Sequence, residues 1–348
     1  MNAAADSTLP ASPRAMATPH PTHKFRLLLR REFWEHKGGF LWAPLVAGGI
    51  SLLLTIMAIV IGEVAARQAL ADGEFDGEVM INGLDLGYLT AKLGPSELAD
   101  LSKGIDLALY MASGWPLIVL GFVVFFYCLG ALYDERKDRS VLFWKSLPVS
   151  DRDTVLSKAA SALLVAPIIA IAASLASMVG FLVVLSALVL IHGGNPYVLL
   201  WGPGNPLDIV ASYAATIPVY TLWALPTVGW LLLCSAWARS KPFLWAVMLP
   251  VFAGVFLSWF DLMPFLDLDS SWFWAHVVAR ILLGTFPAMD LVYREGFGQG
   301  DSPDAVLSDL SAASTLDSLA MPELWVGAVA GALMIMGAIR LRRWRDEG

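Results

Sequence analysis

The chain has 348 residues, a formal net charge of -7 and only 15% charged residues, while 57% of its residues are hydrophobic. A soluble domain carries about 25% charged residues. Because the apolar residues gather in long runs without charge, the composition excludes an ordinary soluble protein and predicts a membrane protein. The two cysteines, Cys128 and Cys234, lie inside apolar runs and are interpreted as packing residues. Nothing in the sequence indicates a disulfide framework or a metal site.

Residues 1–22 are rich in Ala, Ser, Thr and Pro, and no apolar signal-peptide core follows them directly, so we expect a disordered cytoplasmic tail. Residues 23–40 then predict an amphipathic helix on the inner membrane surface, with Gly38 and Gly39 allowing a turn into the membrane. Its apolar stripe follows i, i+3, i+4, i+8 spacing through Phe25, Leu28, Leu29 and Phe33, and Arg30 is among the basic residues beside it. Two interpretations stay open: a simple interfacial anchor, or an elbow helix that also contacts a cytoplasmic partner.

Six apolar segments are long enough to cross a bilayer, so residues 41–339 predict an all-α transmembrane domain. These segments are 41–62, 112–132, 159–191, 209–236, 243–260 and 322–339. The third and fourth are longer than the hydrocarbon layer requires. We expect them to tilt, to project into water, or to kink at Pro167, Pro218 or Pro226.

The basic residues indicate the orientation of these spans. Most of the 23 lysines and arginines fall in the N-terminal arm, in the loop 133–158, in the turn after the fourth span and in the tail 340–348. The positive-inside rule therefore places both termini in the cytoplasm. The outer loops 64–111 and 261–321 are acidic instead. A solvated outer surface explains this charge better than a calcium or cationic-ligand site, since no EF-hand pattern is present.

Residues 272–289 are apolar but carry His276 and Arg280, which share one helix face at i, i+4 spacing. A seventh span would place the arginine-rich tail outside, against the charge rule. We therefore favour a re-entrant or interfacial helix, with a buried external helix and a true span as alternatives. Trp272 and Trp274 suit the level of the lipid headgroups.

The loop 133–158 combines dense charge with an apolar centre. Residues 134–138 predict a water-exposed extension of the second span, and 140–146 a short transverse helix that is ended by Pro148. Ser150 and Asp153 then form an S-x-x-D capping box for the next helix. Phe143 and Trp144 are aromatic anchors of the kind that protein interfaces use. This loop is interpreted as a docking element for another protein, and the alternative is a helix lying flat on lipid.

The run ALYDERKDRSVLFWKSLPVSDRDTVLSK, together with the basic entry helix and the six spans, resembles ABC-2-type permeases of bacterial ABC transporters. The resemblance covers most of the chain from about Phe25. It implies that 140–148 is a coupling helix seated in the ATP-binding subunit, and that the segment between spans five and six is re-entrant. The chain departs from compact members of that family in its long acidic outer loops. The residues expected to couple to the ATPase are Asp134, Glu135, Arg139, Leu142, Phe143, Trp144, Lys145 and Pro148.

No G-x-x-x-x-G-K-[ST] motif occurs, so the chain cannot form a P-loop, and the absence of H-E-x-x-H and G-x-S-x-G disfavours a membrane hydrolase. The span interiors lack ionisable residues, which disfavours an ion-coupled carrier. We expect a transporter subunit that is not itself an enzyme and binds no cofactor, with ATP and Mg²⁺ held by a partner chain. Nucleic acid is not an expected partner.

The polar residues and prolines of span four are candidates for a pathway or hinge, and their alternative role is hydrogen bonding between helices. They are Tyr213, Thr216, Pro218, Tyr220 and Pro226. The expected function is the membrane subunit of an ATP-driven exporter for an apolar or amphipathic cargo in the bacterial inner membrane. Its expected partners are an ABC ATP-binding subunit, a second permease copy or a paralogue, and membrane lipids. The alternative is a non-transporting assembly or signalling subunit driven by the same kind of ATPase.

Overall fold

A computed structural model describes residues 21–71, 94–140, 149–202, 204–261, 270–294 and 302–344, and every regular element in these ranges is a helix. Up to residue 191 these are α1 (Pro21–Glu35), the π-helix η1 (Gly38–Trp42), α2 (Ala43–Ala71), α4 (Pro95–Ser113), α5 (Trp115–Gly130), α6 (Tyr133–Lys137), α8 (Asp151–Ala160), the π-helix η2 (Ser161–Val165) and α9 (Ala166–Ile191). A helix is favoured in these apolar runs because it satisfies every backbone polar group within one segment.

The second half of the chain alternates long helices with short ones. Its elements are the π-helix η3 (Tyr197–Trp201), α10 (Pro206–Trp223), α11 (Leu225–Trp237), α12 (Pro242–Asp261), α13 (Ser270–Phe273), the π-helix η4 (Trp274–Ala279), α14 (Arg280–Leu283), the 3-10 helix η5 (Met289–Tyr293), α15 (Pro303–Asp309), α16 (Ala312–Asp317), the 3-10 helix η6 (Ser318–Ala320) and α17 (Pro322–Trp344). The segment predicted as the outer loop 261–321 is thus largely helical where it is described.

Five helical stretches in the described chain are long and apolar enough to cross a membrane, or six when the bent pair α10–α11 counts as one span. Each predicted span coincides with one of them, so the helical class and the six segments that could cross a membrane are confirmed, as a multi-pass membrane protein requires. The other five are 38–69, 96–137, 151–191, α12 and α17. The stretch 96–137 joins α4, α5 and α6, which places a helix inside the predicted outer loop 64–111 and extends the second span past residue 132 as expected.

The bend between α10 and α11 measures 47°. It falls at Ala224, two residues before Pro226, which stands in the first turn of α11. Proline lacks an N–H and clashes with the preceding turn, so a straight helix cannot run through this point. Pro218 lies inside α10 without breaking it. Of the predicted kink sites in span four, the bend therefore belongs to Pro226.

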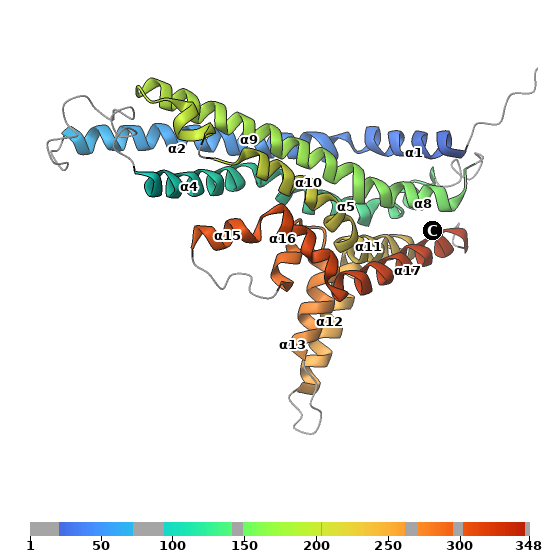
Figure 1. Ribbon diagram of the computed structural model, residues 1–348. Coiled ribbons are helices and arrows are strands. Elements are labelled where there is room, and N and C mark those ends of the chain that lie inside the picture. Colours follow the sequence, from blue (N-terminus) through green and yellow to red (C-terminus); the bar gives the residue numbers. More distant parts are fainter. Residues whose placement is uncertain are drawn as a thin grey trace, which may run out of the picture.

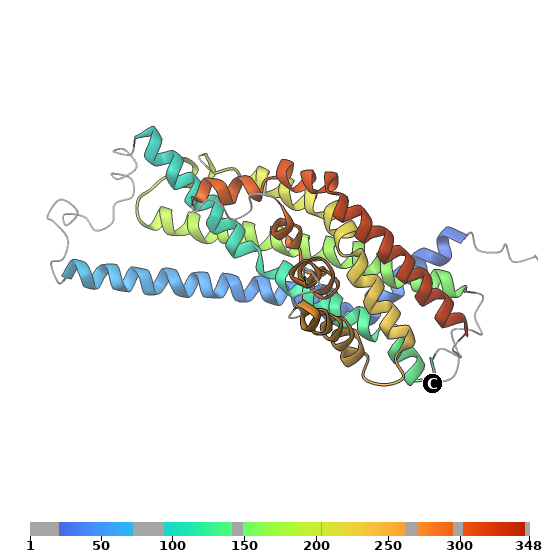
Figure 2. The same ribbon diagram turned by 90° about the horizontal axis from the view of Figure 1, so that it is seen from below.

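Figures 1 and 2 show the long helices other than α12 lying side by side, roughly along one axis, with α2 along one edge of the bundle. The start of α1 and the end of α17 lie at the same end of it (Figure 1). We call this the basic end, because Arg342 and Arg343 close α17 there, and we call the opposite end the outer end. At the outer end, α4 and α15 are joined by an ion pair between Lys103 and Asp304 at 2.9 Å.

The core of the bundle lies where α5, α8, α9, α11 and α17 meet. The closest approach is between α11 and α17. A Cβ atom at Gly229 would lie 2.5 Å from the backbone oxygen of Gly331, so only glycine fits at this crossing. Small residues at a helix crossing let the backbones pack closely, which is how helices associate where lipid replaces water.

α12 and the helical run α13–η4–α14 form a hairpin that projects away from the bundle (Figure 1). Inside the hairpin, the Trp274 indole donates to Ser258 Oγ at 2.9 Å and covers Gly254. This run is the ambiguous segment 272–289. It is helical and packs against α12, and its placement as a re-entrant or interfacial helix stays a prediction.

Candidate functional site

Three charged residues from three separate helices meet inside the basic end of the bundle. Lys158 of α8 lies between Glu32 of α1 and Glu135 of α6, with its Nζ 3.0 Å from an oxygen of each carboxylate. Their side chains are 2%, 1% and 7% exposed, respectively. These side chains are therefore paired in the protein interior rather than solvated at its surface.

Further residues extend this cluster to two more helices, α17 and α5. Arg342 of α17 donates to Glu135 at 2.7 Å and to Asp151 of α8 at 3.1 Å. The Tyr127 hydroxyl of α5 donates to Glu32 at 2.9 Å. We call this set, Glu32, Tyr127, Glu135, Asp151, Lys158 and Arg342, the buried ion network.

The charged residues of the buried ion network fix how α1, α6, α8 and α17 sit against one another. Desolvating an ion costs several kcal/mol, and only well-placed opposite charges and hydrogen bonds offset that cost. The central Lys158 has two carboxylates within reach, and Glu135 has both Lys158 and Arg342. Moving any one helix away would leave a buried charge without its partner. These helices are therefore expected to move as one unit.

Sequence reasoning found only part of the network. Glu135 is one of the residues predicted to couple to an ATPase; its carboxylate points inward to Lys158 and Arg342, and its coupling role stays a prediction. Glu32 was missed, although it stands four residues after the stripe residue Leu28 and so shares its buried face. A carboxylate on an apolar stripe indicates a buried charge that needs a partner. Lys158 is a weaker indication of the same kind, since it stands directly before an apolar run.

The predicted coupling residues divide between the described and undescribed parts of the chain. Leu142, Phe143, Trp144, Lys145 and Pro148 lie outside the described residues. Of the others, Asp134 is exposed, and so is Arg139, which adopts a φ of 56° where the chain leaves α6. As predicted, Ser150 caps α8: its Oγ accepts a hydrogen bond from the Asp153 N–H at 3.1 Å.

The predicted stripe of α1 faces the bundle. Leu28 is buried, Phe25, Leu29 and Phe33 are half-buried, and Arg30 is exposed. Phe33 packs against the core, and α1 lies against α8. The stripe therefore packs on the bundle, whereas a position of α1 on the inner membrane surface and its contact with a cytoplasmic partner stay predictions.

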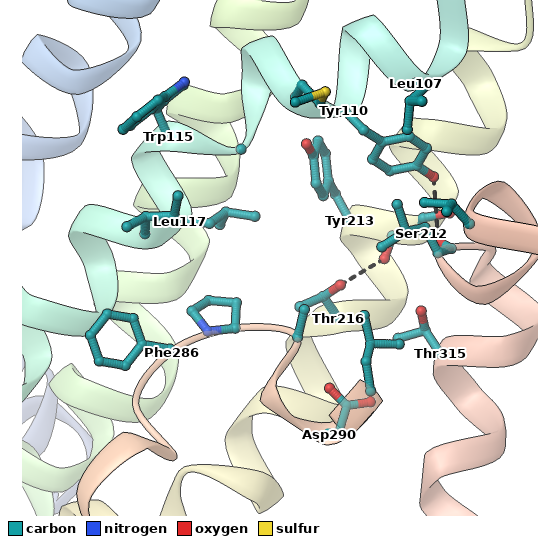
Figure 3. A pocket seen from close by; sticks show the side chains of 18 of the residues that line it. Leu107, Tyr110, Trp115, Leu117, Ser212, Tyr213, Thr216, Phe286, Asp290 and Thr315 are labelled. Carbon is teal, nitrogen blue, oxygen red and sulfur yellow. Dashed lines mark hydrogen bonds between the residues drawn. The ribbon is translucent and has the colours of Figure 1, made fainter. Parts of the chain in front are cut away.

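A second feature is an open cavity of about 600 Å³ toward the outer end, lined by α4, α5, α10 and the segments 286–294 and 306–315. We call it the outer cavity. Figure 3 shows Tyr110, Tyr213 and Thr216 around it. Tyr213 and Thr216 are two of the predicted pathway residues. The others lie elsewhere, since Tyr220 is buried in the core, Pro218 is exposed and Pro226 packs beside Gly331.

The walls of the cavity are mostly apolar, and its tyrosine hydroxyls and charged groups are paired. The hydroxyls of Tyr213 and Ser113 lie 2.6 Å apart, and the Tyr110 hydroxyl donates to the Leu310 carbonyl at 3.3 Å. The charged lining residues, Asp290 and Arg294, form an ion pair at 2.7 Å. A concave apolar site with a few fixed polar groups is typical of small-molecule binding. Both tyrosines and the ion pair come from segments that are distant in sequence. The packing of α4 against 286–294 and 306–315 could therefore not be predicted from the sequence.

Among the described residues, no group of three His, Cys, Asp or Glu side chains is placed to hold a metal ion. No family model, curated protein or solved structure matches the chain. The site is therefore interpreted from its own geometry: a buried ion network at one end and an apolar cavity toward the other.

Proposed function

We propose that the chain is the membrane-spanning permease subunit of an ATP-driven ABC exporter of the ABC-2 type. In this proposal it lies in the bacterial inner membrane with both termini in the cytoplasm, so that the basic end is the cytoplasmic end. A separate ABC ATP-binding subunit holds ATP and Mg²⁺. A second permease copy or a paralogue completes the pathway.

The buried ion network is the observation that carries this proposal. Residues 141–148, the centre of the proposed coupling helix, connect α6 to α8. Both helices are tied by Glu135, Lys158 and Asp151 to α1 and α17. A partner that pushes on 141–148 would therefore move the first and last helices of the chain together with the ends of spans two and three. A coupling element needs this kind of rigid attachment to pass on a movement.

The outer cavity supports an amphipathic or apolar cargo. Its volume of about 600 Å³ falls within the range of small-molecule pockets, about 300–1,000 Å³. Its two charged lining residues neutralise each other, so a strongly ionic cargo would meet no unpaired opposite charge. The 47° bend of α10–α11 lies just past Thr216 of the cavity wall, where a change of bend would open or close the cavity.

The proposal is tested by the double variant Phe143→Ala with Trp144→Ala in the full chain, reconstituted with its ATPase. We expect partner binding or cargo-stimulated ATP hydrolysis to fall strongly, because aromatic anchors carry much of an interface's binding energy. Trp344→Ala is the matched control, since this tryptophan is 83% exposed. Full ATPase coupling in the double variant would overturn the assignment of 140–148. Normal coupling without flux in the unmodified protein would favour the assembly or signalling role.

A further inference from the structure

A second cavity, of about 710 Å³, shares no lining residue with the outer cavity and opens between α8–η2 and α17, with Phe25 of α1 beside it. Its apolar lining includes Leu156 and Leu164 on one side and Met336 on the other, which are 38%, 42% and 50% exposed. Thr221 and Leu225 at the α10–α11 bend form its floor. We call this cavity the basic groove, because three arginines belong to its rim.

The arginines gather at one end of the basic groove. Arg152 stands at the start of α8, and Arg340 and Arg343 stand in the last turns of α17. The contact of Arg342 with Asp151 at 3.1 Å brings these two helix ends side by side. Arg152, Arg340 and Arg343 are exposed, and none of them forms an ion pair with a carboxylate in the described part of the chain. The groove thus has a cationic mouth and an apolar interior.

The length of the groove fits one leaflet of a membrane. Its lining along α8 and η2 runs from Arg152 to Leu164, which at about 1.5 Å per residue spans roughly 18 Å. Half of a typical hydrocarbon core is about 15 Å. An acyl chain that enters at the basic end would therefore lie along the groove, with its headgroup beside the arginines.

We propose that the basic groove binds a phospholipid with an anionic headgroup, taken from the leaflet at the basic end. Guanidinium groups bind phosphate oxygens through paired, charge-assisted hydrogen bonds. Arg152, Arg340 and Arg343 contact the headgroup phosphate, and the apolar lining between Leu156 and Met336 holds the acyl chain. The inference rests on the membrane location of the chain and not on the cargo or the ATPase partner.

The test is native mass spectrometry of the full chain in detergent, titrated with phosphatidylglycerol or with phosphatidylcholine of the same acyl chains. We expect phosphatidylglycerol to bind at least about tenfold more tightly, since each basic residue near an anionic headgroup contributes measurably. Arg340→Gln with Arg343→Gln should remove this preference. The matched control, Arg239→Gln with Lys241→Gln, removes two exposed charges from the turn before α12 and should keep it.

The apolar half of the groove is tested separately. Ala332→Trp places an indole in the lining and should weaken the binding of both lipids. Leu333→Trp, at the adjacent residue that is 58% exposed and not part of the lining, should not. If the double glutamine variant does not fold, Arg152→Gln replaces it and is expected to halve the preference or more.

Four results would overturn the proposal. Equal binding of the two lipids would show that the arginines do not recognise an anionic headgroup. An equal loss of the preference for phosphatidylglycerol in the Arg239 and Lys241 control would mean that the basic end attracts anionic lipids without a specific site. Displacement of the lipid by millimolar inorganic phosphate would mean a site for free phosphate. Cross-linking of Leu156→Cys between two copies in the lipid-free protein would mean that a second chain covers the groove.

Discussion

The Nζ of Lys158 donates to Oε1 of Glu32 at 3.0 Å in the protein interior, although the two residues are 126 positions apart in the sequence. The pair links the helix before the first span to the start of the third. With Glu135 and Arg342 it also holds the end of the second span and the end of the last. The network thus surrounds the base of the loop that we propose as the contact with an ATPase, with residues from α1, α5, α6, α8 and α17.

Lys158→Met is expected to destabilise the chain by about 3–5 kcal/mol, because it leaves Glu32 and Glu135 buried without their shared cation. The measurement is unfolding in detergent, followed by circular dichroism against denaturant. Lys137→Met, at the exposed end of α6, is the control and should change stability by less than about 0.5 kcal/mol. Equal stability of the two variants would show that the network does not hold the helices.

Glu32→Gln added to Lys158→Met should recover part of the lost stability, because the double variant no longer buries the unpaired charge of Glu32. The same unfolding measurement gives the coupling energy between the two sites. A purely additive loss would contradict direct pairing of these side chains.

The crossing of α11 and α17 provides an independent test of the fold. Gly229→Ala is expected to cost about 1–3 kcal/mol, because its Cβ would strike the backbone of Gly331 and force the helices apart. Gly49→Ala in α2 is the matched control, since a Cβ there meets nothing within 4 Å. A neutral effect at Gly229 would mean that the two helices do not pack closely in the membrane.

Filling the outer cavity should block transport. Thr216→Trp adds an indole to the cavity wall and is expected to abolish most cargo-stimulated ATP hydrolysis and flux into inverted vesicles. Thr55→Trp in α2 is the control, because both threonines donate to the carbonyl four residues earlier and Thr55 is not part of the cavity lining. Unchanged flux in Thr216→Trp would exclude this cavity from the pathway.

The bend in span four is a further candidate for movement. Pro226→Ala restores the missing N–H and should reduce the 47° bend, and with it the rate of transport. Pro218→Ala should have a smaller effect, because α10 stays unbroken at that position. The measurement is the transport kinetics of the variant that carries both substitutions. If these kinetics match those of the unsubstituted protein, the bend is not a hinge.

The spans could be predicted from the sequence because a run of about 20 apolar residues is a local property. The same holds for the stripe of α1 and for the Ser150 cap. The network could not be predicted, because nothing local pairs Lys158 with Glu32 or turns Glu135 inward. The outer cavity could not be predicted either. Only tertiary packing brings Tyr213 beside Tyr110 and places Arg294 in the same lining. The projection of the α12 hairpin likewise depends on packing that composition does not specify.

We propose that a separate ATPase drives this chain. The decisive measurement is to purify the tagged, full-length chain in a mild detergent from its native membrane and to identify the co-purifying proteins by mass spectrometry. We predict a P-loop ATPase in stoichiometric amount, which is reduced when Phe143 and Trp144 are replaced by alanine. Reproducible absence of such an ATPase from folded, intact protein would contradict the transporter assignment.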